Sequence, residues 1–322
     1  MRVLVTGAGG FLGRHVVDRL VERGHAVRAI IRPAAPEPAW HDDVQTFRAD
    51  LRVDNRLVSA FADIDAVIHL AAAVTGSEDV QFASTAVATE RLLEAMVHAS
   101  VKRIVHVSSL VVYDWSRARR VLDEDTPLLA NVYEMGGYTI AKSWQERVVA
   151  RYAKAYSLDL TVMRPGFIWG PDHVDLAGMG RHHGRLYMMF GPRTRLPLTH
   201  VVNCADCLVA AAESRAAIGQ TFNVIDDDDV RVWRYVAEFA RRTGRRGVMM
   251  PIPYRIGLGV AQLATLTSRA LYGRKGKLPS LLTPRRFEQQ FKPIRFSNRK
   301  VASLLGWKPR LSFAESLDVS FP

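Results

Sequence analysis

A glycine-rich turn that begins at residue 6 constrains the fold of this chain more than any other feature. Thr6–Gly13 reads TGAGGFLG, directly after the apolar run Arg2–Thr6 and overlapping a helical pattern over Phe11–Arg23. Glycines allow a tight turn and a close approach of the backbone to a ligand, and the first turn of a helix offers unpaired N–H groups to a phosphate. A strand, this turn and a helix in that order predict a dinucleotide-binding unit.

The first 165 residues continue this alternation of strand and helix patterns, which forms a parallel sheet covered on both faces. We therefore predict an α/β fold with a Rossmann-type, doubly wound parallel sheet in residues 1–165. Later segments near residues 200–225 return to this sheet, and residues 166–322 form mainly a smaller C-terminal substrate-binding lobe. Further strands are predicted at Ala26–Ile31, Val44–Ala49, Ala66–Leu70, Arg103–Val107, Leu160–Arg164 and Thr221–Val224, and further helices at Thr85–Ala99, Tyr138–Tyr156, Cys204–Glu213 and Val232–Arg242.

The whole net charge of +12 lies in the second half of the chain. Residues 1–165 contain 20 Lys/Arg and 20 Asp/Glu, whereas residues 166–322 contain 24 and 12. This excess of positive charge favours binding of an anionic substrate or an anionic surface, or it only keeps the protein soluble. No zinc-finger spacing and no aromatic–basic RNA-binding motif is present, so we expect an anionic small-molecule substrate and no nucleic acid.

Cysteine usage and hydropathy indicate the compartment. Cys204 and Cys207 are too few for a disulfide framework, which fits a reducing environment. They open a helical pattern without a second pair of ligands, so we expect them to pack inside the protein, and we expect no metal site. No stretch approaches eighteen uncharged apolar residues, and no basic segment followed by a long apolar core opens the chain. We therefore expect a soluble, cytoplasmic protein without a transmembrane segment.

Hydroxyl and amine side chains form a candidate reactive set. Tyr138 and Lys142 lie four residues apart in YTIAK, on one face of a predicted helix. A phenol with a pKa near 10 is a poor base at neutral pH, and a neighbouring ammonium group favours its ionised form. Ser108 and Ser109 follow the strand Arg103–Val107. Because side chains at the carboxyl end of a parallel strand point into the crevice where ligands bind, these serines are candidates for contacts with a ligand.

Together with the glycine turn, these residues resemble the extended short-chain dehydrogenase/reductase family, also called the NAD-dependent epimerase/dehydratase family. The resemblance covers nearly the whole chain. TGAGGFLG resembles the TGxxGxxG loop of the family, and YTIAK resembles its YxxxK motif. Further matching segments are Asp50-Leu51, His69-Leu70-Ala71-Ala72, Arg164-Pro165-Gly166 with Ile168-Trp169-Gly170-Pro171, His200-Val201-Val202-Asn203 and Leu305-Gly306-Trp307-Lys308-Pro309.

The resemblance implies a role for each matching residue. Tyr138 is the general acid/base that exchanges a proton with a substrate hydroxyl or carbonyl group, and Ser109 binds the substrate oxygen. Lys142 lowers the pKa of the tyrosine and holds the ribose hydroxyls, while hydride passes to or from the nicotinamide. Besides Tyr138 and Lys142, the implied cofactor contacts are Gly7, Gly10, Phe11, Leu12, Gly13, Asp50, Leu51, Leu70, Ala71, Ala72, Pro165, Gly166 and Ile168.

The chain departs from the family pattern at several positions. The 4,6-dehydratases carry an Asp-Glu pair directly after the catalytic hydroxyl, and here Leu110 and Val111 occupy those positions. Since neither side chain can transfer a proton, we do not expect sugar dehydration. Asp114 stands where the family often has glycine, and Thr85 aligns with an asparagine of many members.

The choice of cofactor depends on the end of the second strand. NAD binding usually requires an acidic residue there, which accepts hydrogen bonds from the ribose hydroxyls. The chain has Arg32 at this point and no carboxylate. Because a guanidinium group can pair with a 2′-phosphate, we favour NADP over NAD. The alternative is that Arg32 stacks on the adenine, which leaves NAD as the cofactor.

Two segments of the second half bear on the substrate. The residues Arg181, His182, His183, Arg185, Arg193 and Arg195 either contact a phosphate or carboxylate of the substrate or belong to a solvated loop. Tyr254–Tyr272 is more apolar than a surface helix needs, and Arg274-Lys275-Gly276-Lys277 follows it. This helix is a substrate lid, a buried packing helix, or an interfacial helix that brings residues 254–277 to a membrane surface.

These observations favour an NAD(P)-dependent epimerase or oxidoreductase for a secondary alcohol or ketone, with a nucleotide sugar as the leading substrate. The alternatives are a 3β-hydroxysteroid dehydrogenase-like enzyme or carbonyl reductase for an apolar substrate, and a non-catalytic NADP-sensing regulator. The resemblance also implies a homodimer that pairs the helices Thr85–Ala99 and Tyr138–Tyr156 across a two-fold axis. In that dimer, Val87, Leu92 and Met96 supply part of an apolar seam.

Overall fold

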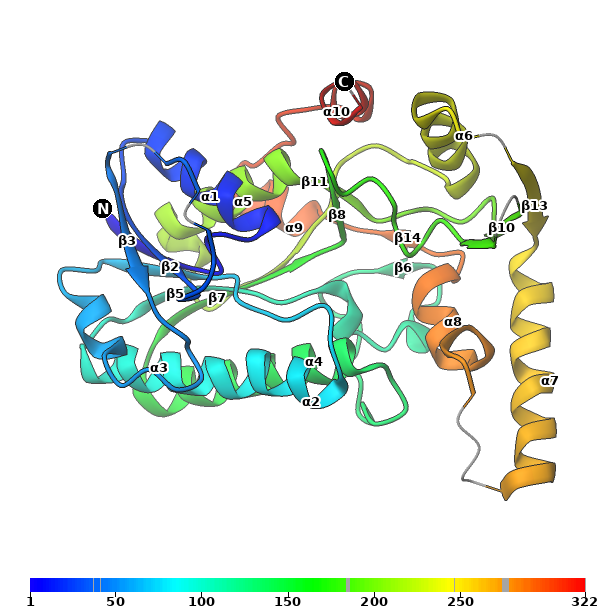
Figure 1. The fold of residues 1–322 in the computed structure, drawn as a ribbon, viewed down its shortest axis with the longest axis horizontal. Helices are drawn as coiled ribbons and strands as arrows, with labels where there is room; N and C mark the ends of the chain where they lie inside the picture. Colours follow the sequence, from blue (N-terminus) through cyan, green and yellow to red (C-terminus); the bar gives the residue numbers. More distant parts are fainter. Residues whose placement is uncertain (37, 41, 184–185, 246, 274–277, 322) are drawn as a thin grey trace.

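A seven-stranded parallel sheet lies at the centre of the computed structural model (Figure 1). The structure describes residues 1–36, 38–40, 42–183, 186–245, 247–273 and 278–321. The strands follow one another across the sheet in the order β12-β7-β5-β4-β1-β2-β3. The α/β fold with a Rossmann-type sheet is therefore confirmed. The strands are β1 (Arg2–Thr6), β2 (Ala26–Ile31), β3 (Val44–Arg48), β4 (Ala66–His69), β5 (Arg103–Val107), β7 (Asp159–Pro165) and β12 (Thr221–Val224).

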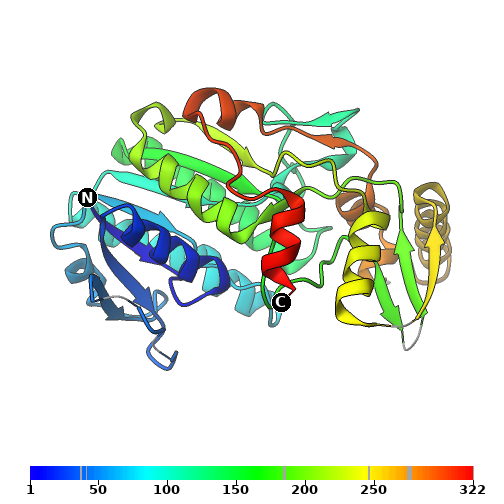
Figure 2. The same cartoon turned by 90° about the horizontal axis from the view of Figure 1, so that it is seen from above.

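Helices cover both faces of this sheet (Figures 1 and 2). On one face lie α1 (Phe11–Glu22) and α5 (Val201–Glu213), and on the other lie α3 (Ala88–His98) and α4 (Gly137–Tyr156). The apolar residues of α1 at helical spacing, among them Val16 and Leu20, are fully buried against the sheet. Cys204 and Cys207 are buried in α5, as the sequence predicts.

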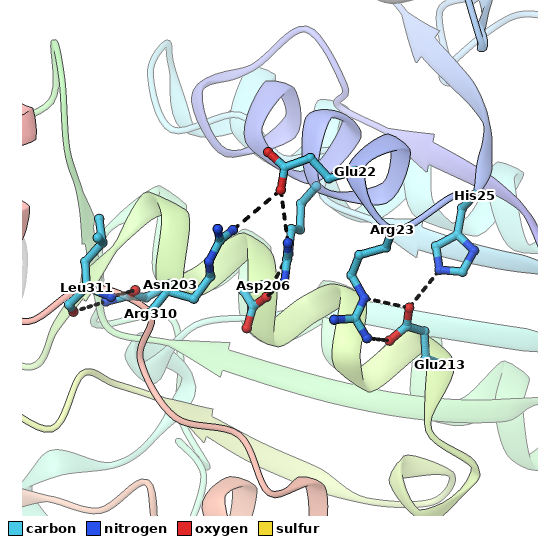
Figure 3. A network of polar contacts seen from close by, with 9 residues as sticks. Glu22, Arg23, His25, Asn203, Asp206, Glu213, Arg310 and Leu311 are labelled. Carbon is cyan, nitrogen blue, oxygen red and sulfur yellow. Dashed lines mark hydrogen bonds and ion pairs between the residues drawn. The ribbon is translucent and has the colours of Figure 1, made fainter.

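Polar contacts join α1, which belongs to the first half of the chain, to α5 (Figure 3). The guanidinium group of Arg23 donates two hydrogen bonds to the carboxylate of Glu213, at 2.9 and 2.5 Å. The Nε2 atom of His25 lies 2.8 Å from the same carboxylate. The side chain of Asn203 pairs with the backbone of Leu311, with both hydrogen bonds at 2.9 Å. These contacts fix the second half of the chain onto the sheet.

The remaining elements of the second half form a smaller lobe beside the carboxyl end of the sheet (Figure 2). This lobe contains two short sheets, one of β13, β10 and β9 and one of β11 and β8. The strands are β8 (Phe167–Trp169), β9 (Arg181–His183), β10 (Leu186–Phe190), β11 (Leu198–His200) and β13 (Val248–Ile252), and the helices are α6 (Val232–Thr243), α7 (Tyr254–Tyr272), α8 (Pro284–Phe291) and α10 (Phe313–Ser320). The helix α9 (Arg299–Leu305) instead packs against β12 of the main sheet. The smaller elements are α2 (Glu78–Phe82), β6 (Val121–Leu122) and β14 (Arg295–Phe296).

One expectation about helix packing is corrected, and one of the three alternatives for a second helix is excluded. Leu92 and Met96 are 0% exposed in the core between α3 and the sheet, so they cannot belong to an apolar seam on the surface; of the three proposed residues only Val87 is exposed. The physical reason is their spacing, because residues four apart share one helix face and that face is turned toward the sheet. The helix Tyr254–Tyr272 is not buried, because only one of its faces packs against the lobe.

Candidate active site

The turn after β1 and the first turn of α1 each have room only for glycine at one position. Gly7 has a φ of +69°, and a Cβ atom there would lie 3.0 Å from the backbone nitrogen of Ala71. A Cβ atom at Gly13 would lie 2.1 Å from the carbonyl oxygen of Gly7. Gly10 begins α1 without a side-chain cap, so the first N–H groups of the helix have no side-chain partner. This open, positively polarised helix start fits a pyrophosphate.

The residues implied to bind the cofactor lie along one edge of the sheet. Each follows the carboxyl end of a strand, and the carboxyl ends of parallel strands share one edge. In the order of the sheet they are Asp50 and Leu51 after β3, Arg32 after β2, Gly7 after β1, Leu70, Ala71 and Ala72 after β4, and Pro165, Gly166 and Ile168 in and after β7. Ser109 follows β5 at the same edge.

Tyr138 and Ser109 meet at the carboxyl end of β5. Tyr138 is the second residue of α4, and its hydroxyl is hydrogen-bonded to the hydroxyl of Ser109. Burial raises the pKa of Tyr138 to about 12, and the hydrogen bond with Ser109 acts in the opposite direction. The phenol therefore holds its proton at neutral pH. The expected lowering of this pKa by Lys142 is not found, because that ammonium group is held elsewhere.

Lys142 is buried beneath Tyr138. Its Nζ atom donates a 2.7 Å hydrogen bond to the carbonyl oxygen of Val107 and a second, short one to Oε1 of Gln145. Burial lowers the pKa of Lys142 to about 7, while the carboxylate of Glu146 acts to raise it. The lysine therefore titrates near neutral pH, so its charge depends on the groups around it.

Gln145 is a site residue that the sequence analysis missed. It accepts from Lys142 with one amide atom and donates with the other to the carbonyl oxygen of Ala71 at 3.0 Å and to Oγ1 of Thr89 at 2.8 Å. It therefore connects the lysine to the segment after β4. The available signal was its position three residues after Lys142, which places both side chains on the same face of α4.

Two neutral histidines lie side by side under this site. His69 on β4 pairs with His106 on β5, and their ring centroids lie 5.7 Å apart. His69 has hydroxyl partners at both ring nitrogens, Thr6 and Thr89, each at 2.7 Å. Burial lowers the pKa of His69 to about 3 and lowers that of His106 well below its ordinary value, with Lys142 adding to both shifts.

Arg32 and Asp50 lie near each other at the adenine end of the edge. The carboxylate of Asp50 is engaged by Arg52, which donates to it with its backbone N–H at 2.9 Å and with its guanidinium group. These hydrogen bonds lower the pKa of Asp50, and the positive charge of Arg32 adds to the shift. Arg32 itself is exposed and forms no ion pair with a residue that the structure describes. Its guanidinium group is therefore available to an anionic ligand.

The basic residues considered for substrate binding are placed in the lobe. Arg181 donates to the carbonyl oxygens of Ala177 and Gly180, at 3.3 and 2.9 Å. Arg195 forms an ion pair with Asp229 at 2.6 Å. Arg193 is exposed. Of the others, His182 and His183 contribute backbone to β9, and their side chains, like the whole of Arg185, lie outside the described part of the chain.

Apolar residues follow Ser109 and precede α4. Leu110, directly after Ser109, is buried, and Leu129, Val132 and Met135 form a small apolar cluster in the segment before α4. A cleft of about 300 Å³ opens beside the start of α4. It is lined by Glu78, Asp79, Phe82, Tyr133, Gly137, Ile140 and Trp144.

Comparison with known proteins identifies similar sequences. Residues 3–224 match the family described as the NAD dependent epimerase/dehydratase family. The chain is 29% identical, over 84% of its length and 82% of the relative, to the 4-hydroxy-2-methyl-3-oxo-4-farnesyl-3,4-dihydroquinoline-1-oxide ketoreductase of Stigmatella aurantiaca. It is 28% identical, over 100% of its length and 90% of the relative, to a 3 beta-hydroxysteroid dehydrogenase/Delta 5-->4-isomerase of Mycobacterium tuberculosis.

Solved structures share the same fold. MoeE5 in complex with UDP-glucuronic acid and NAD superposes with a TM-score of 0.72 at 25% identity, covering 100% of this chain and 98% of that one. The UDP-glucuronic acid 4-epimerase from Bacillus cereus gives a TM-score of 0.73 at 21% identity, with coverage of 100% and 98%. The second likeness shows the fold alone.

Proposed function

The chain belongs to the NAD dependent epimerase/dehydratase family, and on that premise we propose that it is an NAD(P)-dependent ketoreductase or dehydrogenase for an apolar secondary alcohol or ketone. It is an enzyme of the extended short-chain dehydrogenase/reductase type. The proposal concerns which member of that type it is, because the family also contains epimerases of nucleotide sugars.

The observation that carries the proposal is the pair of apolar residues, Leu110 and Val111, that directly follows Ser109. Three further apolar residues, Leu129, Val132 and Met135, form a cluster in the segment before α4. A diphosphate needs cationic partners, and the guanidinium groups of Arg181 and Arg195 are engaged within the lobe. The relatives that reduce a farnesylated ketone or oxidise hydroxysteroids support the same substrate class.

The protonation of the site favours reduction of a ketone. When bound, the nicotinamide supplies or accepts a hydride at its C4 atom. Tyr138, with a pKa of about 12, carries the proton that a carbonyl oxygen requires as it becomes an alcohol, and Ser109 orients that oxygen through its own hydroxyl. Lys142 lies below the tyrosine with a pKa of about 7, so it can hold or release a proton as the charge nearby changes.

For the cofactor, we propose a preference for NADP(H) over NAD(H). The exposed guanidinium group of Arg32 follows β2, where an acidic residue would otherwise accept from the ribose hydroxyls. The NAD in the MoeE5 complex supports the opposite choice. The glycine turn fits either cofactor, because both contain the pyrophosphate that it receives.

A nucleotide-sugar epimerase is the second candidate function. MoeE5, which binds UDP-glucuronic acid, shares 25% identity and the whole fold with this chain. The excess of 12 positive charges in the second half supports an anionic substrate. Leu110 and Val111 argue against a 4,6-dehydratase under both candidate functions, because neither side chain can transfer a proton.

An assay that follows nicotinamide absorbance separates the two functions. The purified chain is incubated with NADPH or NADH and either a 3-ketosteroid or a farnesylated ketone, and separately with UDP-glucuronic acid or UDP-glucose. Steady oxidation of the cofactor with an apolar ketone supports the proposal. Conversion of a UDP-sugar to its epimer, without net change in cofactor absorbance, overturns it in favour of the second candidate.

For the assembly and compartment, we propose a cytoplasmic homodimer that pairs α3 and α4 of two copies. Because Leu92 and Met96 are buried, we place the dimer contact at exposed residues instead. Examples are Val87, in the π-helical segment directly before α3, and Phe82 at the end of α2. Light scattering at micromolar concentration tests this assembly, and a strictly monomeric mass would exclude it.

A further inference from the structure

The helix α7 stands at the end of the molecule opposite the N-terminus and packs with only one face (Figure 1). On the packed face, Ala261 is fully buried, and the position of Gly257 is filled by the ring of Phe287 on α8, which a Cβ atom would approach to 2.4 Å. Tyr254 stacks on the same ring, with a centroid distance of 5.9 Å. The helix is therefore held firmly to α8 along one side.

The opposite face of α7 is apolar and exposed. Ile256, Val260, Leu263, Leu266 and Leu271 recur at a spacing that places them on one side of the helix, and Leu263 and Leu266 are 62% and 63% exposed. The neighbouring strand β13 is at the edge of its sheet and exposes three further apolar side chains, Val248, Met249 and Met250. We call these eight residues the α7–β13 surface. Exposed apolar side chains gathered in this way mark a surface that contacts another apolar body.

The segment around this surface carries positive charge only. Residues 239–287 contain eleven lysines and arginines and no aspartate or glutamate. Arg255 and Arg269 are exposed on α7 itself, beside its apolar face. Residues 274–277, which add three of the eleven, lie outside the described part of the chain. An exposed apolar face flanked by basic residues is the pattern of a helix that lies in a membrane interface.

We propose that the α7–β13 surface docks on membranes that contain anionic lipid. Acyl chains accept the apolar side chains, and lipid phosphates attract the surrounding basic residues. A second copy of the chain is a poorer occupant, because pairing two such surfaces would bring two segments of the same charge together. No described helix is both long enough and apolar enough to cross a bilayer, so α7 lies along the membrane surface.

The docking surface is connected to the active site through one helix. On α8, Gln289 donates to the carbonyl oxygen of Val111 at 2.6 Å and accepts from Thr139, the neighbour of Tyr138, at 3.3 Å. Arg286 donates to the carbonyl oxygen of Met135 at 2.7 Å. The helix α8 therefore joins the docking surface to the backbone beside Ser109 and Tyr138. The inference does not depend on the substrate proposed above, because it rests on the surface alone.

Co-sedimentation of the full chain with lipid vesicles tests the proposal. Two compositions are compared, phosphatidylcholine alone and phosphatidylcholine with about one-third phosphatidylglycerol. We expect binding to the anionic vesicles at least about tenfold stronger than to the neutral ones, weakening as salt is raised. The double variant Leu263→Glu/Leu266→Glu should bind the anionic vesicles at least about tenfold more weakly than the wild type. Its circular dichroism and NADPH binding should equal those of the wild type.

Matched variants keep the test decisive. Leu304→Glu changes an apolar residue that is 46% exposed on α9, away from this surface, and should retain vesicle binding. The double variant Arg255→Gln/Arg269→Gln should bind anionic vesicles more weakly, while its binding to neutral vesicles should not change. Equal binding of wild type and the double variant, or no binding of the wild type to anionic vesicles, overturns the proposal. A wild-type dimer in light scattering that Leu263→Glu dissociates, without vesicle binding, would assign the surface to a second copy.

Discussion

The carboxyl edge of the sheet and the α7–β13 surface place polar and apolar groups in opposite ways. At the sheet edge, polar side chains such as Lys142, Gln145 and His69 are buried and hydrogen-bonded to one another. On α7, apolar side chains such as Leu263 are exposed without a partner. Both arrangements are costly for a protein that only needs to fold, since buried polar groups and exposed apolar patches each oppose stability.

This difference suggests separate roles for the two halves of the chain. Buried polar groups can hold a proton or a ligand in fixed geometry, and their positions follow from the strands and helices of the first half. An exposed apolar face can attach the protein to another body, and it belongs to the second half. The proposed division is that the sheet edge binds cofactor and transfers protons, whereas the α7–β13 surface attaches the molecule.

The largest expected effect tests the chemical side of this division. Tyr138→Phe removes the proton that the substrate oxygen receives, and turnover should fall by at least about 10²-fold, while NADPH affinity stays largely intact. Vesicle binding should be unchanged. Tyr156→Phe, a change on an exposed tyrosine of the same helix, is the control and should keep full turnover. Full turnover of Tyr138→Phe would remove the assigned acid–base role.

The second prediction locates cofactor choice in the first half. A charge-assisted contact between Arg32 and a 2′-phosphate is worth about 1.5–3 kcal/mol, which corresponds to roughly a ten- to 150-fold tighter binding of NADPH than of NADH. Arg32→Ala should lose most of this preference, because it weakens the binding of NADPH and not that of NADH. Arg32→Asp should invert the preference, so that NADH binds more tightly. Fluorescence titration of both cofactors at one salt concentration measures it. Equal affinities in the wild type would favour stacking of Arg32 on adenine.

The third prediction concerns the glycine turn. Gly13→Ala places a Cβ atom against backbone that cannot move aside, so this change should lower the free energy of unfolding by about 1–3 kcal/mol. It should also weaken the binding of the cofactor. Gly9→Ala is the matched control for stability, since its Cβ atom would lie 3.5 Å from the nearest atom, on the side chain of Ile31. Thermal unfolding without cofactor compares the two. Equal melting temperatures would show that the turn can relax around Gly13.

The smallest expected effect is a pH dependence of stability. Because the folded pKa of His106 lies well below 6.5, the unfolded chain binds a proton below that pH and the folded chain does not. Stability is therefore lost as pH falls. Between pH 6.5 and 5.5 the wild type should lose about 1 kcal/mol relative to His106→Leu. Urea unfolding at both pH values measures it, with His98→Gln, on the exposed end of α3, as the control. Parallel losses in wild type and His106→Leu would mean that His106 is protonated in the folded protein.

The sheet and the meeting of Tyr138 with Ser109 at its carboxyl edge could be predicted from the sequence. β1, β2, β5 and β12 begin and end where periodicity places them, since each is a short apolar run bounded by turn or helix signals. β9 and β10 could not be predicted in the same way, because they lie in a stretch rich in glycine and basic residues where no alternating pattern stands out.

The environment of Lys142 also could not be predicted. The spacing of Tyr138 and Lys142 shows that they share a helix face, but not that Val107 and Gln145 hold the ammonium group. Those contacts depend on how closely α4 packs on β5, which is a property of the assembled layers. The degree of burial of Tyr138 depends on the same packing, and it is burial that raises the pKa of this phenol, against the hydrogen bond with Ser109.

The order of the strands has a consequence for how the chain folds during synthesis. β1, made first, lies inside the sheet, and β12, made some two hundred residues later, completes its edge. On the face that α1 and α5 share, α5 covers β4, β5 and β7, so that part of the face stays open to water until residues 201–213 have left the ribosome. An exposed sheet face on a growing chain is a binding site for molecular chaperones and a starting point for aggregation. The yield of folded protein in a cell is therefore expected to depend on the speed with which this late segment is synthesised.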